Sequence, residues 1–171
     1  DLLGISVPNA TVQLEDTNLE ASGPLLITHW GMSGPAILKL SAFGARVLAE
    51  KNYEYQVQVD WLSRPTHKIV NVLLNLKKKQ SKKQVIVRSP FEEIPKRLWE
   101  RFVLATTVKT TFNWADVSHE QIDALANQLT KSIFTAKGKS TFKEEFVTAG
   151  GVDLKEINFK NFESKLHNNL F

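Results

Sequence analysis

The residues whose types and spacing suit chemistry lie in two glycine-rich stretches, and the first of them is 28–41. A strand-like segment leads into this stretch, and a helical pattern follows from Pro35. Ser33 is predicted to cap that helix, and Pro35 stands in the first turn, where proline is favoured. The backbone N–H groups of such a helix start suit an anion or a polar edge of a ligand.

His29 is the candidate for a catalytic residue in this first stretch, beside Trp30 and Gly31. One hypothesis is that its imidazole faces a cofactor or substrate and acts as a proton donor. The other is that the imidazole hydrogen-bonds the backbone of the turn, and the local sequence favours this structural role.

The second stretch, 148–152, follows a strand-like segment and is built from small residues, namely Thr148, Ala149, Gly150, Gly151 and Val152. Paired glycines let a backbone approach a planar ligand closely. A tight bend or a β-bulge calls for the same residues. The local pattern alone therefore leaves both a binding role and a structural role open.

Several kinds of site are excluded by the residues present. The sequence has no cysteine, which removes disulfides, thiolate chemistry and cysteine metal sites. His67, His119 and His167 have no partners at metal-ligand spacing, so no metal site is predicted. Neither a G-x-S-x-G elbow nor a G-x-G-x-x-G dinucleotide fingerprint occurs in the 171 residues.

The net charge is +4, and much of the excess lies in one basic stretch made of Lys77, Lys78, Lys79, Lys82, Lys83 and Arg88. A surface that binds phosphates or nucleic acid is one interpretation. The other is a solvated helix end, because lysine is favoured near a helix C-terminus. No aromatic side chain is interleaved to stack on bases, so we favour the second interpretation and expect no nucleic-acid partner.

The sequence also predicts where the protein works. No apolar run approaches the roughly 20 residues of a membrane span, and no basic segment precedes an apolar signal core. We therefore expect no membrane partner. The absence of cysteine agrees with a cytoplasmic location, which is our prediction.

Alternation of apolar and polar residues predicts five strands, at 3–7, 11–15, 25–28, 53–61 and 84–87. Pro8 and Asn9 are expected to close the first of them, and 21–24 to form a turn. The alternation is longest at 53–61, where the odd-numbered residues are expected to face the core.

Apolar residues at spacings of three and four predict helices between these strands and over 89–137, after which the chain returns to strand texture. One is expected from Pro35 to Asn52, and a second begins at a capping Thr66 and ends in the lysine run. From 89 to 137 every pattern is helical. There Ser118 and Gln121 form a capping box for a helix that is expected to bury Ile122, Leu125, Leu129 and Ile133.

These elements predict an α+β fold. Residues 1–88 and 138–171 would form a barrel-like, mostly antiparallel β subdomain, discontinuous in sequence. Residues 89–137 would form a small all-α subdomain inserted into it.

Two blocks of this sequence carry a resemblance to a known family. The first is Thr-His-Trp-Gly-Met-Ser-Gly-Pro-Ala-Ile-Leu at 28–38, and the second is Val-Thr-Ala-Gly-Gly-Val at 147–152, followed by Glu-Ile-Asn at 156–158 and Glu-Ser-Lys-Leu at 163–166. In this order they resemble the inserted domain of the bacterial HI0933-like (YhiN/BaiN-type) NAD(P)/FAD-dependent flavoprotein oxidoreductases.

The resemblance implies an excised, substrate-side insert that covers the flavin and shapes the substrate pocket of a longer protein. FAD would be the cofactor of that parent, with NAD(P)H as a candidate donor. The residues expected near the flavin are Gly31, Ser33, Gly34, Thr148, Ala149, Gly150, Gly151 and Val152. The two glycine-rich turns would then lie on one shared face.

The partners implied are the dinucleotide-binding domain of the same chain and a small-molecule substrate of unknown identity. Without that domain, this chain alone is expected neither to hold FAD nor to be catalytic. The alternative is a free-standing module that binds an anionic partner or a nucleic acid through the basic stretch and the sheet.

Overall fold

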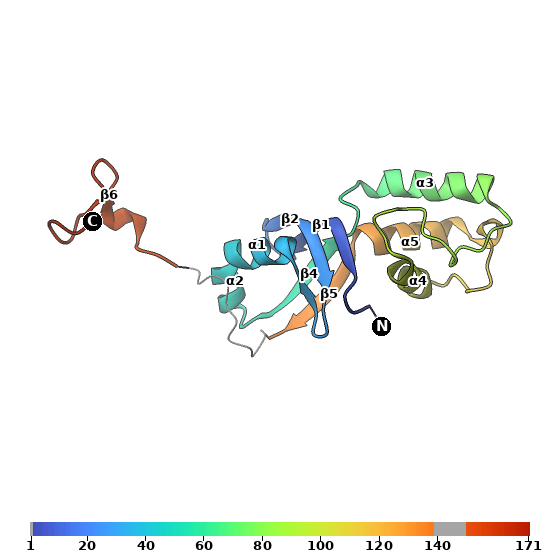
Figure 1. Ribbon diagram of the computed structural model, residues 1–171, viewed down its shortest axis with the longest axis horizontal. Helices are drawn as coiled ribbons and strands as arrows, with labels where there is room; N and C mark the ends of the chain where they lie inside the picture. Colours follow the sequence, from blue (N-terminus) through green and yellow to red (C-terminus); the bar gives the residue numbers. More distant parts are fainter. Residues whose placement is uncertain (1, 139–149) are drawn as a thin grey trace. The chain divides into compact units, whose positions relative to one another are not determined.

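The computed structural model describes residues 2–138 and 150–171, which belong to two compact units, 1–140 and 141–171. The first unit is an antiparallel five-stranded sheet, curled into a half-barrel and accompanied by several helices (Figure 1). The prediction of an α+β fold with a barrel-like antiparallel sheet is confirmed.

The sheet has the order β3-β2-β1-β4-β5, and every neighbouring pair is antiparallel. Its strands are β1 (Ser6–Leu14), β2 (Glu20–Ile27), β3 (Met32–Ser33), β4 (Glu54–Asp60) and β5 (Ser132–Lys137). β5 joins the sheet only after the chain has passed through a helical segment. Its neighbour β4 is therefore a strand far from it in the sequence.

The expected break at Pro8 and Asn9 is wrong, because β1 runs through both residues. The register against β2 shifts between Val7 and Ala10, which marks a bulge or irregularity. A bulge tolerates proline because the unpaired residues there need not donate an N–H to the ladder. The turn expected at 21–24 is also wrong, because these residues lie inside β2, where Ala21 pairs with Val12 and Gly23 with Ala10.

The helix predicted from Pro35 to Asn52 is divided into α1 (Pro35–Phe43) and α2 (Ala45–Glu50). Gly44 separates them, and a Cβ there would lie 2.9 Å from the carbonyl oxygen of Leu40. Ser33 is not the N-cap. Gly34 occupies that position without a side-chain cap, and Pro35 is the first helical residue as predicted.

Three further helices follow, α3 (Thr66–Lys79), α4 (Lys96–Leu104) and α5 (His119–Thr130). In Figure 1 they gather at one end of the sheet, while α1 and α2 lie at the other. Thr66 begins α3 but does not cap it, since Pro65 holds the cap position. The strand expected at 84–87 is reduced to one isolated bridge between Gln84 and Asn113.

The capping box of α5 is confirmed by two reciprocal hydrogen bonds. The N–H of Gln121 donates to the Ser118 hydroxyl at 3.1 Å, and the N–H of Ser118 donates to the Gln121 side chain at 2.9 Å. The expected burial of Ile133 by this helix is wrong, because α5 ends at Thr130 and Ile133 is 55% exposed in β5. Pairing with Gln58 of β4 overrides the helical spacing there.

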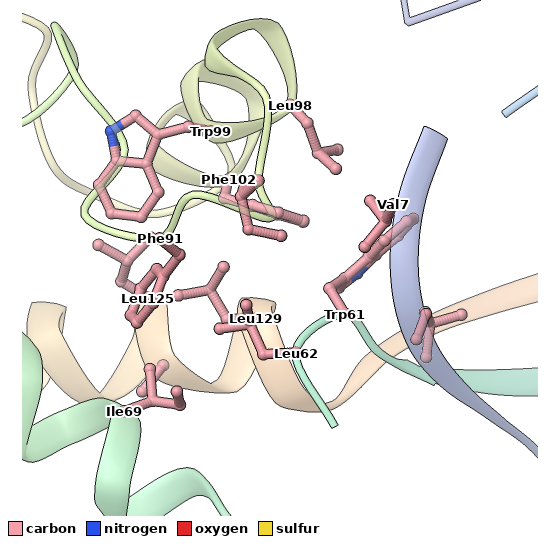
Figure 2. Packing of buried hydrophobic residues seen from close by; sticks show 14 of the residues in the cluster. Val7, Trp61, Leu62, Ile69, Phe91, Leu98, Trp99, Phe102, Leu125 and Leu129 are labelled. Carbon is pink, nitrogen blue, oxygen red and sulfur yellow. The ribbon is translucent and has the colours of Figure 1, made fainter. Parts of the chain in front are cut away.

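The buried residues of the first unit form one cluster that spans the sheet and the helices. Figure 2 shows Trp61 between the helical residues Phe102 and Leu129 and Val7 of β1. Its indole N–H donates to the buried Ser132 hydroxyl at 3.1 Å. The division of the chain at residues 89 and 138 into separate subdomains stays a prediction, although this shared core couples the helices to the sheet.

The second unit contains little regular structure in its described part, 150–171. A short 3₁₀ turn (Leu154–Glu156) leads into a two-stranded hairpin of β6 (Ile157–Asn158) and β7 (Glu163–Ser164). The rings of Phe159 and Phe162 meet edge to face with centroids 6.5 Å apart.

Candidate functional site

The first glycine-rich stretch forms a hairpin with its tip exposed. The N–H of Thr28 donates to the carbonyl of Gly31 at 2.8 Å, and the Thr28 hydroxyl donates to the same oxygen at 3.2 Å. After this turn β3 pairs back on β2, with Met32 opposite Ile27. The sequence predicted a strand leading directly into a helix and missed β3, because two residues are too few to show alternation.

His29 and Trp30 form the tip of this hairpin. Their rings lie 5.5 Å apart between centroids, and Trp30 is 78% exposed. The turn is held by Thr28, and within the described residues the His29 side chain has no hydrogen bond to the backbone. The structural role proposed for His29 therefore has no support, and its catalytic role stays a prediction.

Gly34 is required by the packing of the hairpin base. Its φ of 99° and ψ of 172° lie in a region that is essentially confined to glycine. A Cβ there would lie 2.8 Å from the carbonyl oxygen of Pro24. The first turn of α1 packs on the same part of β2, where Ala36 is completely buried. By contrast, no atom lies within 4 Å of a Cβ built on Gly31, so its backbone is open to a neighbour.

Inside the curl of the sheet, the hairpin borders a hollow of about 780 Å³. This volume is in the range of small-molecule sites. The hollow is bounded by the hairpin, α1, β4, β5 and α4. Its wall is mostly apolar, and the larger side chains on it are Met32, Leu40, Val57, Trp61, Phe102 and Phe134. A mostly apolar hollow of this size can accommodate a flat, partly apolar group.

Tyr55 supplies a proton-bearing group in this hollow. It lies on β4, half-buried, and burial raises the pKa of its phenol above the ordinary value. The phenol is therefore protonated at neutral pH and acts as a hydrogen-bond donor. Among the described residues its hydroxyl has no hydrogen-bond partner.

In the described part of the chain, Arg101 of α4 and Lys137 of β5 are the cationic residues that line the hollow, and Arg101 lines it from a different element than Tyr55. The ion pairs among the described residues join Arg64 to Glu93 and Lys96 to Glu100, and neither involves Arg101. The guanidinium is exposed, and such a group binds carboxylates or phosphates. Ser132 also lines the hollow, and its side chain is held in place because its hydroxyl accepts from the Trp61 indole and donates to the backbone carbonyl of Gln128.

Sequence reasoning did not single out Tyr55 or Arg101. The alternation at 53–61 did place Tyr55 on the inward face, which was the available signal. Arg101 belongs to a helix whose apolar spacing was evident, but nothing in the sequence connects it to a residue of β4. Only the folding of α4 over the sheet brings the two side chains to one hollow.

The second glycine-rich stretch belongs to the other unit. Thr148 and Ala149 lie outside the described residues, while Gly150, Gly151 and Val152 are exposed. A Cβ on either glycine would meet nothing within 4 Å. Whether this stretch shares a face with the hairpin stays a prediction.

No group of three or more His, Asp or Glu residues in 2–138 and 150–171 is arranged to hold a metal ion. His119, the first residue of α5, is exposed. In the same described part of the chain, no helix combines the length and the apolar character needed to cross a membrane.

Comparison with known proteins gives a family match and two curated relatives. Residues 1–147 match the model of the HI0933-like protein barrel and H2TH domain. The chain is 29% identical over 170 residues to the ribosomal RNA dihydrouridine synthase of Haemophilus influenzae, covering 99% of this chain and 39% of that protein. It is 27% identical over 176 residues to the enzyme of the same name from Escherichia coli, covering 96% and 38%. The chain thus spans about two fifths of the length of these relatives.

Proposed function

This chain belongs to the HI0933-like family, and we propose that it is the substrate-side domain of a flavin-dependent oxidoreductase that reduces a uridine of ribosomal RNA. The names of the two relatives support the reaction and the substrate. The observation that carries the proposal is that the family signature residues Thr28, Gly31 and Met32 line the same hollow as Tyr55 and Arg101.

The cofactor of the full-length protein is FAD in this proposal. The exposed backbones of Gly31, Gly150 and Gly151 carry no side chain and meet no neighbour on their Cβ side, which fits contact with a planar ring. The adenine and pyrophosphate need a dinucleotide fingerprint, which this sequence does not contain. The dinucleotide-binding domain of the same chain would supply it.

The residues of the hollow would act on the uracil base. Reduction of its carbon–carbon double bond needs a hydride, which a reduced flavin supplies when bound, and one proton from an acid. Tyr55 lines the hollow and its phenol is protonated, so we assign it to deliver that proton. The apolar wall would exclude water from the base, and Arg101 would hold a phosphate of the RNA.

Tyr55→Phe in the full-length protein is expected to lower kcat for dihydrouridine formation by roughly 100-fold and to leave KM unchanged, because it removes the acid and keeps the ring. Arg101→Gln is expected to raise KM about tenfold or more, because it removes a charge-assisted contact to phosphate. The measurement is the dihydrouridine content of ribosomal RNA after timed reaction, determined by mass spectrometry.

Each variant has a matched control close by in the chain, Tyr53 directly before β4 and Arg97 on α4. Tyr53→Phe and Arg97→Gln make the same chemical changes at residues that do not line the hollow, and both are expected to keep wild-type rates. Flavin absorbance checks that cofactor binding is intact. The proposal is overturned if the full-length protein forms no dihydrouridine, or if the variants in the hollow behave like their controls.

The isolated chain, 1–171, is expected to purify without stoichiometric flavin, because it lacks the fingerprint that binds the dinucleotide phosphates. For the same reason it should not catalyse the reaction alone. Visible absorbance of the purified chain measures this directly. One FAD per chain, retained through gel filtration, would contradict the proposal that the dinucleotide-binding domain is needed to hold the cofactor.

A further inference from the structure

The helical segment 66–130 has a larger net positive charge than the whole chain. It contains eleven Lys and Arg residues against six Asp and Glu, whereas the complete chain has a net charge of +4. Part of this excess is concentrated where α3 ends and two loops meet. The residues Lys78, Lys79, Lys82, Lys83 and Lys109, all exposed, are called here the lysine surface.

The lysine surface is built on a fixed backbone. The loop after α3 is tied to the segment before α5, because the N–H groups of Trp114 and Ala115 donate to the carbonyls of Lys83 and Ser81, both at 3.0 Å. The N–H of Val85 donates to the carbonyl of Phe112 at 3.1 Å, and the Lys109 carbonyl accepts from the Phe112 N–H at 2.9 Å. These bonds bring Lys109 beside the loop that carries Lys82 and Lys83.

Lys77, unlike the neighbouring lysines, has a structural role within the fold. Its ammonium donates to the carbonyls of Ala115 and Val117, which fastens the end of α3 to the segment before α5. The other lysines are thereby presented on a scaffold that is already ordered. A partner that binds them does not have to order the loop, which lowers the entropic cost of association.

The charges of the lysine surface are not compensated within the described part of the chain. Neither of the ion pairs found there includes any of the five lysines. The acid nearest along these loops is Asp116, whose carboxylate accepts from the N–H of Asn113 as a cap of the 3₁₀ turn (Trp114–Asp116). A fixed cluster of unpaired cations attracts a partner with regularly spaced anions.

We propose that the lysine surface docks the phosphate backbone of double-stranded RNA, at a place separate from the hollow. None of the five lysines lines the hollow. This inference rests on the proposed function, from which it takes RNA as the partner. It replaces the sequence-based expectation of no nucleic-acid partner, which depended on the lack of an aromatic platform for stacking.

Stacking is not needed for this mode of binding. Phe112, the aromatic residue beside the lysines, is half-buried, and the Lys109 ammonium lies 5.9 Å from the centre of its ring. The lysine surface therefore offers charge without a platform for single bases. RNA duplexes are recognised mainly through their shape, phosphates and 2′-hydroxyl groups, which such a surface can contact. The hollow would then select the uridine, and the lysine surface would supply affinity.

The test compares two variants of the full-length protein that lose the same charge. The surface variant carries Lys78→Gln, Lys79→Gln, Lys82→Gln and Lys83→Gln, and keeps Lys77 because that side chain has a structural role. The control variant carries Arg46→Gln, Lys131→Gln, Lys155→Gln and Lys160→Gln, all at exposed positions elsewhere. Circular dichroism confirms that both variants are folded.

The probes are a fluorescein-labelled RNA duplex of about 20 base pairs, longer than one double-stranded RNA footprint, and one of its strands alone. Anisotropy is measured from about 50 to 200 mM KCl. Duplex affinity of the surface variant is expected to fall roughly tenfold or more at the low-salt end. Its slope of log K against log salt should be smaller by ~3, since each lost phosphate contact removes nearly one unit. The control variant should stay within about twofold of wild type.

Several results would overturn the docking proposal. These are no duplex binding by wild type, equal slopes for the surface variant and wild type, an equal loss in the control variant, or tighter binding of the single strand. Poly-glutamate that competes as well as RNA would show docking of any polyanion, an acidic protein included, and would also overturn it.

Dihydrouridine formation separates this proposal from the proposed function. If docking alone is wrong, wild type and surface variant will modify ribosomal RNA at equal rates. If the proposed function alone is wrong, neither will form dihydrouridine, yet duplex binding will still depend on the four lysines. If both hold, the surface variant will lose activity on ribosomal RNA and keep it on a short uridine-containing oligonucleotide at saturating concentration.

Discussion

Replacing Trp61 by alanine is expected to lower the free energy of unfolding by about 3–5 kcal/mol, the range for a large buried aromatic side chain. Trp61 is 1% exposed, and its ring lies 5.6 Å from that of Phe102 and 6.0 Å from that of Phe134, between centroids. The substitution opens a cavity where the helices meet the sheet. It also removes the indole donor of the buried Ser132 hydroxyl.

Trp30→Ala is the matched control, because it deletes the same side chain at a position that is 78% exposed. Its effect on stability is expected to stay within ~0.5 kcal/mol. Urea denaturation followed by circular dichroism measures both. Equal effects of the two substitutions would contradict the role of Trp61 in the core. A helical transition separate from that of the sheet would instead support an independent helical subdomain.

Gly34→Ala is expected to destabilise the fold by about 2–4 kcal/mol, because two costs combine at this residue. The backbone conformation, with φ of 99° and ψ of 172°, is strained for any residue with a Cβ. The added methyl group would also lie 2.8 Å from the carbonyl oxygen of Pro24, a backbone atom that cannot rotate away. Relief requires the hairpin base or the start of α1 to shift.

Gly4→Ala separates these two costs. Gly4 also has a positive φ, of 78°, but nothing lies within 4 Å of its added Cβ. Its substitution is therefore expected to cost only ~1 kcal/mol, the conformational part alone. Thermal denaturation of the two variants gives the comparison. If Gly34→Ala is as mild as Gly4→Ala and the full-length protein nevertheless loses flavin, Gly34 serves the cofactor rather than the packing.

Local chemistry was enough to predict several elements from the sequence. The capping box of Ser118 and Gln121 forms as expected, because its partners are three residues apart and need no other part of the chain. Pro35 begins α1 because a fixed φ suits the first helical residue. The alternation at 53–61 predicted β4 and the inward direction of Tyr55, because one face of a strand must meet the core.

The family was also contained in the sequence, because the motif residues at 28–38 and 147–152 could be recognised without coordinates. The structure was needed to see what the first motif forms. Its hairpin exists because β3 pairs with β2, and Gly34 is required because Pro24, ten residues earlier, lies against it.

Long-range pairing decided the features that the sequence analysis missed. Ile133 fits a helical spacing, but hydrogen bonds to β4 draw it into a strand. Pro8 predicts a break, but β1 continues through it because the register against β2 shifts there. The hollow joins Tyr55 of β4 to Arg101 of α4, and the lysine surface joins the end of α3 to Lys109. Periodicity reports which face of an element is buried, whereas only tertiary packing determines which elements those faces meet.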